Sequence, residues 1–188
     1  MGCRCPVPLK TSIFREVVGL DASMDELWTF FSTARNLEHL TPPSQGLRIE
    51  SGGDEPIHVG AAIRISVRPL PFFRTGWLTR ITAVVHPGTV VEDGAWFIDV
   101  QEHGPFSLWR HLHAFRSIPS GGTAVMDRVE YALPLGWLGR IIAGRWALHQ
   151  LEELFRFRRD ALIRQCGAAP IPEEWRDGWP LPEAPGAQ

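Results

Sequence analysis

Apolar and polar residues alternate with a period of two in the stretch from residue 97 to residue 134. Every second residue from Trp109 to Phe115 has an aromatic or imidazole ring, and this alternation is typical of a β-strand with two unlike faces. The chain then reverses at Gly121 and Gly122, because glycine reaches positive φ at little steric cost. The alternation resumes over residues 125–131. We therefore predict two long strands joined by a turn over residues 97–134.

Ionisable side chains share the faces of this predicted hairpin with large aromatic side chains. His111 and His113 are in phase with Trp109, and Asp127 is in phase with Tyr131 on the returning strand. If both aromatic-bearing faces turn inward, the two histidines and the aspartate enter the protein interior. Buried ionisable groups cost several kcal/mol unless they are paired. The pattern therefore predicts a polar cluster in the core, for which a ligand is one explanation.

The pattern before the hairpin predicts a strand, two short helices and further strands. Ser23 and Glu26 have the spacing of a capping box, in which each side chain hydrogen-bonds to the backbone of the other residue at a helix start. Pro42 and Pro43 end the second short helix. The predicted elements are a strand at 11–20, a helix that opens at residue 23, a helical turn at 36–40, strands at 46–51, 61–68 and 77–85, and a short strand at 89–92.

A long helix is predicted after the hairpin, over residues 137–165. Its apolar residues recur at steps of three, four and seven, which places them on one helix face. This stripe consists of Leu138, Ile141, Leu148, Leu151, Phe155 and Leu162. Gly167 ends the helix as the residue after its C-cap. Residues 168–188 are rich in proline and glycine, and we expect an irregular tail that Trp175 and Trp179 attach to the rest.

The order of the elements predicts an α+β fold. Strands follow one another and a long helix comes last, so this helix is expected to cover one face of a curved antiparallel sheet of about six or seven strands. A sheet bent around a single helix leaves room for a cavity between the two. The chain is accordingly divided into a lead-in at 1–10, one domain at 11–167 and a tail at 168–188.

Composition supports one globular domain and argues against several classes of function. The chain has 188 residues, of which 44% are hydrophobic and 21% charged, values typical of an ordinary soluble domain. A formal net charge of −2 argues against a nucleic-acid partner. No run of about 18 apolar residues could span a bilayer, and no signal segment opens the chain. Three cysteines without zinc spacing indicate a reducing, cytoplasmic location.

Short motifs occur in a fixed order between residues 12 and 165. They are Phe30-Phe31, Asn36-Leu37-Glu38, Leu40-Thr41-Pro42-Pro43, Gly104-Pro105, Trp109-x-His111-x-His113-x-Phe115, Asp127-x-Val129-x-Tyr131 and Leu133-Pro134-Leu-Gly136. In this series the chain resembles the bacterial SRPBCC ligand-binding family. That family belongs to the START-like, helix-grip superfamily, which also holds polyketide cyclases and plant hormone-binding proteins. The resemblance implies a helix-grip fold with a deep, largely apolar cavity. It implies no catalytic residues, because the superfamily includes enzymes, carriers and regulators.

We expect the cavity to hold a small, mostly apolar molecule without any cofactor. The residues expected to contact it are Trp109, Phe115, Tyr131, Phe97, Trp77, Phe31, Leu151, Phe155 and Arg158. Arg158 lies near the inner stripe of the long helix. There it either neutralises a buried carboxylate or an acidic ligand, or extends its charged end to solvent over a buried stem.

Asp99, His111, His113 and Asp127, hereafter the polar cluster, are the candidate catalytic residues. Histidine titrates near neutral pH, so such a cluster can move protons. The alternative is a structural role, in which the same residues brace adjacent strands. No metal is expected, because the two histidines need a third ligand and the sequence has no further Cys or His partner at metal spacing.

Three functions are compatible with the sequence. The first is binding of a small apolar molecule in the cavity. The second is a cyclase-type or dehydratase-type enzyme in which His111 or His113 is the general base and Asp127 orients it. The third is a protein-interaction module that uses the tail around Trp175 and Trp179. Internal polar groups that line empty space favour the enzyme, and an exposed apolar patch on the tail favours the third function. The oligomeric state stays open.

Overall fold

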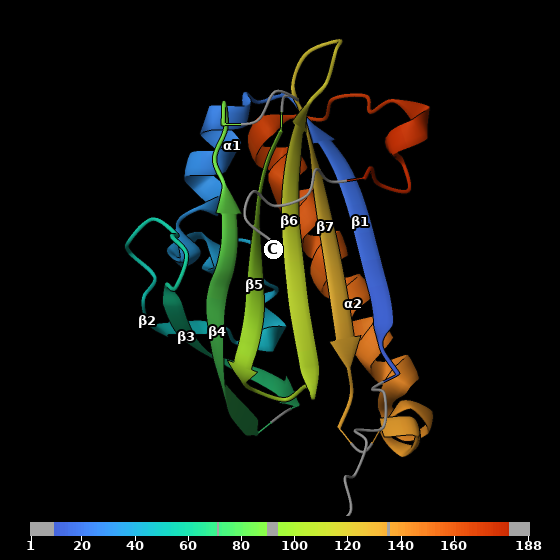
Figure 1. The fold of residues 1–188 in the computed structure, drawn as a ribbon. Coiled ribbons are helices and arrows are strands. Elements are labelled where there is room, and N and C mark those ends of the chain that lie inside the picture. The colour runs from blue at the N-terminus through green and yellow to red at the C-terminus, as the bar shows by residue number, and fades with distance from the viewer. Residues whose placement is uncertain (1–9, 71, 90–93, 135, 181–188) are drawn as a thin grey trace, which may run out of the picture.

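Seven antiparallel strands form one curved sheet that packs around a long C-terminal helix (Figure 1). The computed structural model describes residues 10–180 apart from residues 71, 90–93 and 135. The elements are β1 (Ser12–Leu20), α1 (Met24–Phe31), η1 (Ala34–Glu38), η2 (Pro43–Gln45), β2 (Arg48–Ser51), β3 (Ala62–Leu70), β4 (Phe73–Val85), β5 (Gly94–His103), β6 (Leu108–Ser117), β7 (Thr123–Ala132), α2 (Gly136–Cys166) and η3 (Glu173–Trp175). The expected α+β, helix-grip architecture is confirmed.

The strand order in the sheet is β1-β7-β6-β5-β4-β3-β2. Strands β2 to β7 therefore follow one another as neighbours, and β1 returns to pair with β7 from Ser12 opposite Tyr131 to Leu20 opposite Thr123. In Figure 1, α2 passes behind β6 and β7, and α1 lies at one end of the sheet. This arrangement places β5, β6 and β7, which carry the polar cluster, over the middle of α2.

The stretch from residue 97 to residue 134 contains parts of three strands and not two. The chain reverses at residues 104–107, between β5 and β6. Gln101 closes this turn, because its side-chain amide donates to the Phe106 carbonyl at 2.7 Å and accepts from the Phe106 backbone N–H at 3.3 Å. The predicted turn at Gly121 and Gly122 is confirmed between β6 and β7, and both glycines have positive φ. Most of the short strand expected at 89–92 lies outside the described residues.

The helix signals before the sheet are confirmed in part. The capping box is present at the start of α1, where the Ser23 backbone N–H donates to Glu26 at 2.9 Å and the Glu26 N–H donates to the Ser23 hydroxyl at 3.3 Å. The second predicted helix is not an α-helix: η1 is a 3₁₀ helix of five residues. Its Asn36 side chain donates to the Phe30 carbonyl at 2.7 Å. A segment this short, followed by Pro42, lacks the length that an α-helix needs.

The long helix buries part of the predicted stripe. Leu151, Phe155 and Leu162 are buried as expected, whereas Ile141 is 71% exposed and Leu148 is 40% exposed, so these two assignments are wrong. The side chain of Leu138 lies outside the described part of the chain. Ala147 and Arg158 complete the buried face, and a search for large apolar residues does not select either of them. Among the described residues, no helix is long and apolar enough to cross a membrane.

The residues after α2 fold back onto the outer face of the sheet. Gly167 ends the helix with φ +80°, and the Ala169 N–H then donates to the Gly19 carbonyl of β1 at 3.0 Å. Trp175 is buried against Ile118, and the Arg116 guanidinium lies 4.7 Å above its indole ring. The tail therefore covers apolar surface on the side of the sheet opposite α2.

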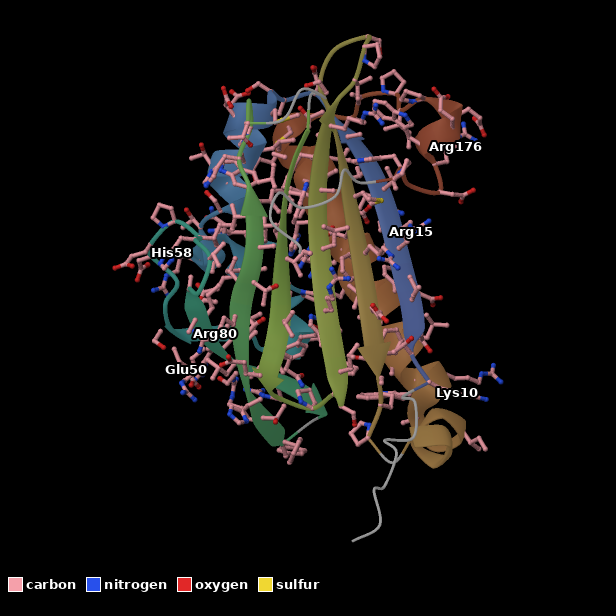
Figure 2. All side chains as sticks on the ribbon, in the orientation of Figure 1. Lys10, Arg15, Glu50, His58, Arg80 and Arg176 are labelled. Atoms are coloured by element: carbon pink, nitrogen blue, oxygen red, sulfur yellow. The ribbon has the colours of Figure 1, made fainter. Side chains whose placement is uncertain are left out.

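Most charged side chains lie on the outside of the molecule. Figure 2 shows Arg15, Glu50 and Arg80 pointing away from the body of the protein. Arg80 forms a two-contact ion pair with Glu102 at the surface. The charged side chains inside, between the sheet and α2, are therefore exceptions and identify the region that needs a functional explanation.

Candidate functional site

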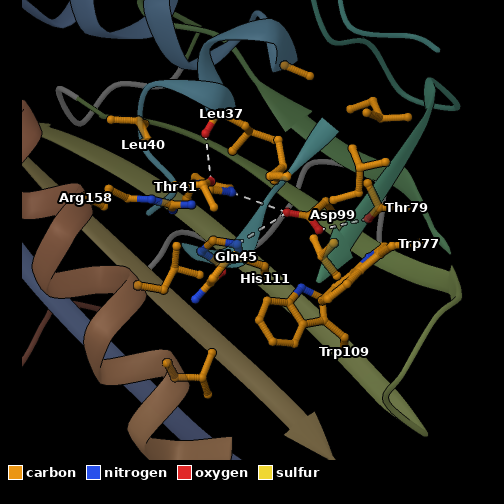
Figure 3. Close-up of a pocket in the computed structure, with 18 of the residues that line it drawn as sticks. Leu37, Leu40, Thr41, Gln45, Trp77, Thr79, Asp99, Trp109, His111 and Arg158 are labelled. Carbon is orange, nitrogen blue, oxygen red and sulfur yellow. Dashed lines mark hydrogen bonds and ion pairs between the residues drawn. The ribbon is translucent and has the colours of Figure 1, made fainter. Parts of the chain in front are cut away.

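A cavity of about 250 Å³ lies between the inner face of the sheet, α2 and the segment that carries η1 and η2. Aliphatic and aromatic side chains form most of its wall. The rings of Trp77 and Trp109 meet edge to face at one end, with centres 4.9 Å apart (Figure 3). Phe97 contributes to the wall from β5, and Leu151 contributes from α2. The cavity is thus a mainly apolar space lined by both the sheet and the helices.

Six of the nine residues predicted to contact a ligand line this cavity. They are Phe31, Trp77, Phe97, Trp109, Leu151 and Arg158. The other three, Phe115, Tyr131 and Phe155, are buried but do not line it.

The three that do not line the cavity pack into the core around it. Phe155 stacks on Phe14 of β1, with ring centres 4.8 Å apart. Phe115 meets the ring of Phe31 edge to face at 5.2 Å, and that ring separates it from the cavity. Tyr131 packs against Phe106 at the far end of the sheet. Period-two alternation places all three on the inner face, but it cannot tell a wall residue from one packed behind the wall.

The polar cluster comes together as predicted, through contacts between directly opposite and diagonal residues on neighbouring strands. Asp99 of β5 pairs with His111 of β6, and His113 of β6 pairs with Asp127 of β7. His111 Nε2 lies 2.9 Å from Asp127 Oδ1 in a hydrogen bond. His113 Nδ1 lies 2.9 Å from the same oxygen as an ion-pair contact. One oxygen of Asp127 therefore faces both imidazole rings.

The second carboxylate of the cluster, Asp99, closes the arrangement on the cavity side. Its Oδ2 lies 3.3 Å from His113 Nε2 and 3.6 Å from His111 Nδ1. Its Oδ1 accepts a hydrogen bond of 2.9 Å from the Thr79 hydroxyl of β4. Asp99, His111 and His113 line the cavity, whereas Asp127 lies behind the histidines. Each imidazole is thus placed between the same two carboxylates.

Charge pairing sets the protonation of the carboxylates and of His113. Burial opposes ionisation of Asp127, but the Arg158 guanidinium and the two histidines outweigh it and hold the pKa of this carboxyl well below its usual value. Burial likewise raises the pKa of Asp99, and the contacts with His113 and His111 lower it by more. Burial lowers the pKa of His113, but its contacts with Asp127 and Asp99 raise it above the usual value.

His111 has the opposite balance. Burial first, and then the positive charge of His113, lower the pKa of His111 to about 4. His111 is therefore neutral at pH 7 and donates from Nε2 to Asp127, which leaves the lone pair of Nδ1 facing the cavity side of the cluster. With His113 protonated, the cluster and Arg158 carry two negative and two positive charges. The site as a whole is neutral.

The same groups could supply metal ligands. One donor atom each from Asp99, His111 and His113 lies within 4.8 Å of the others, and two histidines with a carboxylate are a common set for divalent metals. Arg158 Nη1, however, lies 3.3 Å from Asp127 Oδ1, and this permanent positive charge opposes a cation nearby. The expectation of no metal at this site stays a prediction.

The sequence interpretation missed several residues at the cavity. Thr79 holds Asp99, and the alternation that places Trp77 and Ile81 on one face of β4 also placed Thr79 there. Gln45 and Asn36 bring polar groups to the wall from η2 and η1. No periodic signal marked these two, because 3₁₀ segments of three and five residues are too short to show one.

No protein-family model and no curated protein sequence matches the chain. Solved structures do resemble it. Norcoclaurine synthase from Thalictrum flavum is similar with a TM-score of 0.58 and 14% identity, over 88% of this chain and 94% of the synthase. The ginseng major latex-like protein 151 from Panax ginseng is similar with a TM-score of 0.52 and 15% identity, over 81% of this chain and 98% of that protein.

A third similar structure is the di-domain ARO/CYC protein BexL from the BE-7585A biosynthetic pathway, with a TM-score of 0.61 and 17% identity over 85% of this chain. The chain spans about half of that protein, 51% of its length. At these identities the likenesses establish the fold, which is the helix-grip fold. What the chain does with it has to be argued from its own cavity.

Proposed function

We propose that the protein binds a small, mostly apolar molecule in the cavity between the sheet and α2. The observation that carries this proposal is the space of about 250 Å³ with its mainly aliphatic and aromatic wall. Protein interiors are normally packed to the density of organic crystals, and an empty space forfeits the dispersion contacts of its lining. A cavity of this kind is typical of a ligand site.

The volume indicates the size class of the ligand. An engineered apolar cavity of about 150 Å³ in another protein stays dry and binds benzene. The present cavity, at about 250 Å³, is larger. It therefore suits a ligand of one or two fused rings, or an aliphatic molecule of similar bulk.

A second candidate function is acid–base catalysis on the bound molecule. The observation in its favour is that Asp99, His111 and His113 line the cavity, so a proton-accepting group faces the place where a ligand would lie. A neutral imidazole with a free lone pair, such as that of His111, has the protonation state of a general base. In this form the enzyme is a cyclase or dehydratase type in which the polar cluster moves the proton.

The third candidate, interaction through the tail, has less support. Trp175 is only 9% exposed and packs on Ile118 and Ala124, so its indole is occupied within the protein. The cytoplasmic location expected from the sequence stays a prediction. The net charge of −2 supports the expectation that nucleic acid is not a partner.

A cavity-filling substitution tests the proposed function. Ala147 lies on the buried face of α2 and lines the cavity, so Ala147→Phe puts a ring into the space that the ligand needs. The probe is 2-naphthalenemethanol, measured by isothermal titration calorimetry. We expect binding to the wild-type protein and an affinity at least about tenfold lower in the variant, a change of about 1.4 kcal/mol.

The matched control is Ile141→Phe, which adds a ring to the exposed side of the same helix. This variant is expected to bind the probe like the wild-type protein. If the wild-type protein does not bind the probe, or if Ala147→Phe binds it as well as the control does, the proposed function is wrong.

A further inference from the structure

Arg158 is a buried arginine at the wall of the cavity. Its side chain is 6% exposed, and Figure 3 shows it reaching from α2 toward the centre of the site. Its guanidinium carbon lies 4.8 Å above the ring of Phe155, which fixes the plane of the group from below. The surface arginines in Figure 2 can turn to water, whereas this one cannot. Its hydrogen-bond donors must therefore find partners inside the site.

Only a small part of the donor capacity of Arg158 is used within the protein. Nη1 donates to Asp127 Oδ1 over 3.3 Å, and that oxygen is already shared by His111 and His113. Nε is buried and has no hydrogen-bond partner among the residues that the structure describes. Nη2 of Arg158 likewise has no hydrogen-bond partner among the residues that the structure describes. The edge of the guanidinium formed by Nε and Nη2 thus has no hydrogen-bond partner among the described residues.

The same chain shows what this edge of a guanidinium binds. Arg35 donates from Nε to Asp54 Oδ1 at 2.9 Å and from Nη2 to Asp54 Oδ2 at 2.7 Å, two parallel bonds to one carboxylate. Arg80 holds Glu102 with the same two nitrogens. Two parallel N–H groups match the two oxygens of a carboxylate, and such bidentate pairs are among the strong ion pairs of proteins. Arg158 presents this fork without a carboxylate on it.

We propose that the ligand of this cavity is an apolar carboxylic acid whose carboxylate binds to the Nε–Nη2 edge of Arg158. The apolar body then lies against the aliphatic and aromatic wall, with Trp109 at the far end. This inference rests on the proposed binding function and specifies its ligand class. It explains why an arginine occupies the buried stripe of α2, where Leu151 and Leu162 are its neighbours.

Charged and titratable groups surround the place where the carboxylate would lie. They are Asp99 of β5, His111 and His113 of β6, and Asp127 of β7. Asp127 already contacts Nη1 of Arg158. The Nε–Nη2 edge is therefore the part of the guanidinium that remains for a ligand.

Two probes with the same ring system test this proposal in the full-length protein. 2-Naphthoic acid is ionised at pH 7, because carboxyl groups titrate near pH 4, and 2-naphthalenemethanol is its neutral counterpart. Isothermal titration calorimetry is expected to show at least about tenfold tighter binding of the acid to the wild-type protein.

Substitutions at Arg158 then assign the preference to its side chain. Arg158→Met keeps much of the side-chain length and removes the fork, so the two probes are expected to bind with similar affinity. Arg158→Lys retains the charge without the fork, and we expect it to lose most of the preference for the acid. If Arg158→Met does not fold, Arg158→Lys alone tests whether the Arg158 fork causes the preference for the acid. Arg156→Met, at a side chain that is 61% exposed on the same helix, is the matched control and is expected to keep the preference.

The outcomes separate this inference from the function on which it rests. If the alcohol binds the wild-type protein as tightly as the acid does, the cavity binds apolar molecules and the carboxylate inference is wrong. If the acid is preferred and Arg158→Lys keeps the full preference, Arg158 is not the carboxylate site and the inference is again wrong. If neither probe binds, the proposed function itself fails.

Discussion

The imidazole rings of His111 and His113 lie with their centres 3.8 Å apart, between the carboxylates of Asp99 and Asp127. Alternate residues of one strand point the same way, and the register of β5, β6 and β7 brings a carboxylate to each side of the pair. The buried charges are therefore compensated inside the sheet. Arg158 on α2 adds a contact of 3.3 Å to the same network, which joins the helix to the sheet at the cavity wall.

Asp127 is expected to be important for stability. Asp127→Asn keeps the shape of the side chain but removes the negative charge that faces His111, His113 and Arg158. Breaking a buried charge network of this kind costs about 3–5 kcal/mol, because the remaining charges lose their compensation. Urea unfolding followed by tryptophan fluorescence measures this loss.

The control for Asp127→Asn is Asp160→Asn, at a side chain that is 50% exposed and pairs with Arg159 at 3.5 Å. It is expected to change the free energy of unfolding by less than about 0.5 kcal/mol. An Asp127→Asn protein as stable as the wild type would contradict the structural role of the network and would favour the catalytic one.

His111 and His113 are expected to make the free energy of unfolding depend on pH in opposite directions. The folded-state pKa of His111 is about 4, and an unfolded histidine titrates near 6.5. Between these values the unfolded chain binds more protons, so the contribution of His111 rises as the pH increases from about 4 to about 6.5. The folded-state pKa of His113 is raised. Its contribution is complete below about pH 6.5 and is lost as the pH rises through that raised pKa.

Stability should therefore pass through a maximum near pH 6.5, as measured by urea midpoints across the pH range. His111→Gln is expected to flatten the acid side of this curve, and His113→Gln the alkaline side. Each variant is the control for the other. Three curves of identical shape would show that the histidines do not have the protonation states assigned to them.

Phe155 should matter far more to stability than an apolar residue elsewhere on α2. It is 1% exposed and stacks on Phe14 with ring centres 4.8 Å apart. Phe155→Ala removes these contacts and leaves a cavity, for an expected loss of about 3–5 kcal/mol. Ile141→Ala, at a position that is 71% exposed, should cost less than about 0.5 kcal/mol. Equal effects in thermal or urea unfolding would mean that α2 presents the other face to the sheet.

Attachment of the tail depends on the absence of a side chain at Gly19. A Cβ atom at this position would collide with the Ala169 carbonyl oxygen and approach the Ile171 side chain to 2.7 Å. Gly19→Ala should therefore displace the tail from β1 and cost about 1–3 kcal/mol. Gly76 on β4 has open space where a methyl group would be added, so Gly76→Ala is the matched control and should be nearly neutral. Faster proteolysis after residue 167 only in Gly19→Ala would confirm that the tail is released.

Strand periodicity predicted the sheet and the polar cluster because successive side chains of a strand point to opposite faces of the sheet. His111 and His113 had to share a face with Trp109, and the structure places all three at the cavity wall. Helical periodicity was less decisive. Apolar spacing placed Leu151, Phe155 and Leu162 on the buried face of α2 correctly, but it also selected Ile141 and Leu148, which are exposed.

The rest of the site depends on information that a single strand or helix does not carry. Gln101 creates a turn by hydrogen-bonding to Phe106 five residues away, which divides one predicted strand into two. The positions of Gln45 and Asn36 follow from how η1 and η2 pack against the sheet. The unpaired Nε–Nη2 edge of Arg158 can be recognised only in the structure. There Asp127 accepts a hydrogen bond from Nη1, and Nε has no partner among the described residues.

The position of a bound probe tests the central claim, that the cavity between the sheet and α2 is the ligand site. In an isotope-filtered NOESY experiment, the aromatic protons of bound 2-naphthalenemethanol are expected to show contacts to the methyl groups of Ile63, Ile65 and Leu151, which line the cavity. Contacts confined to Val17 and Met126, which pack in a separate cluster outside the cavity lining, would contradict the account.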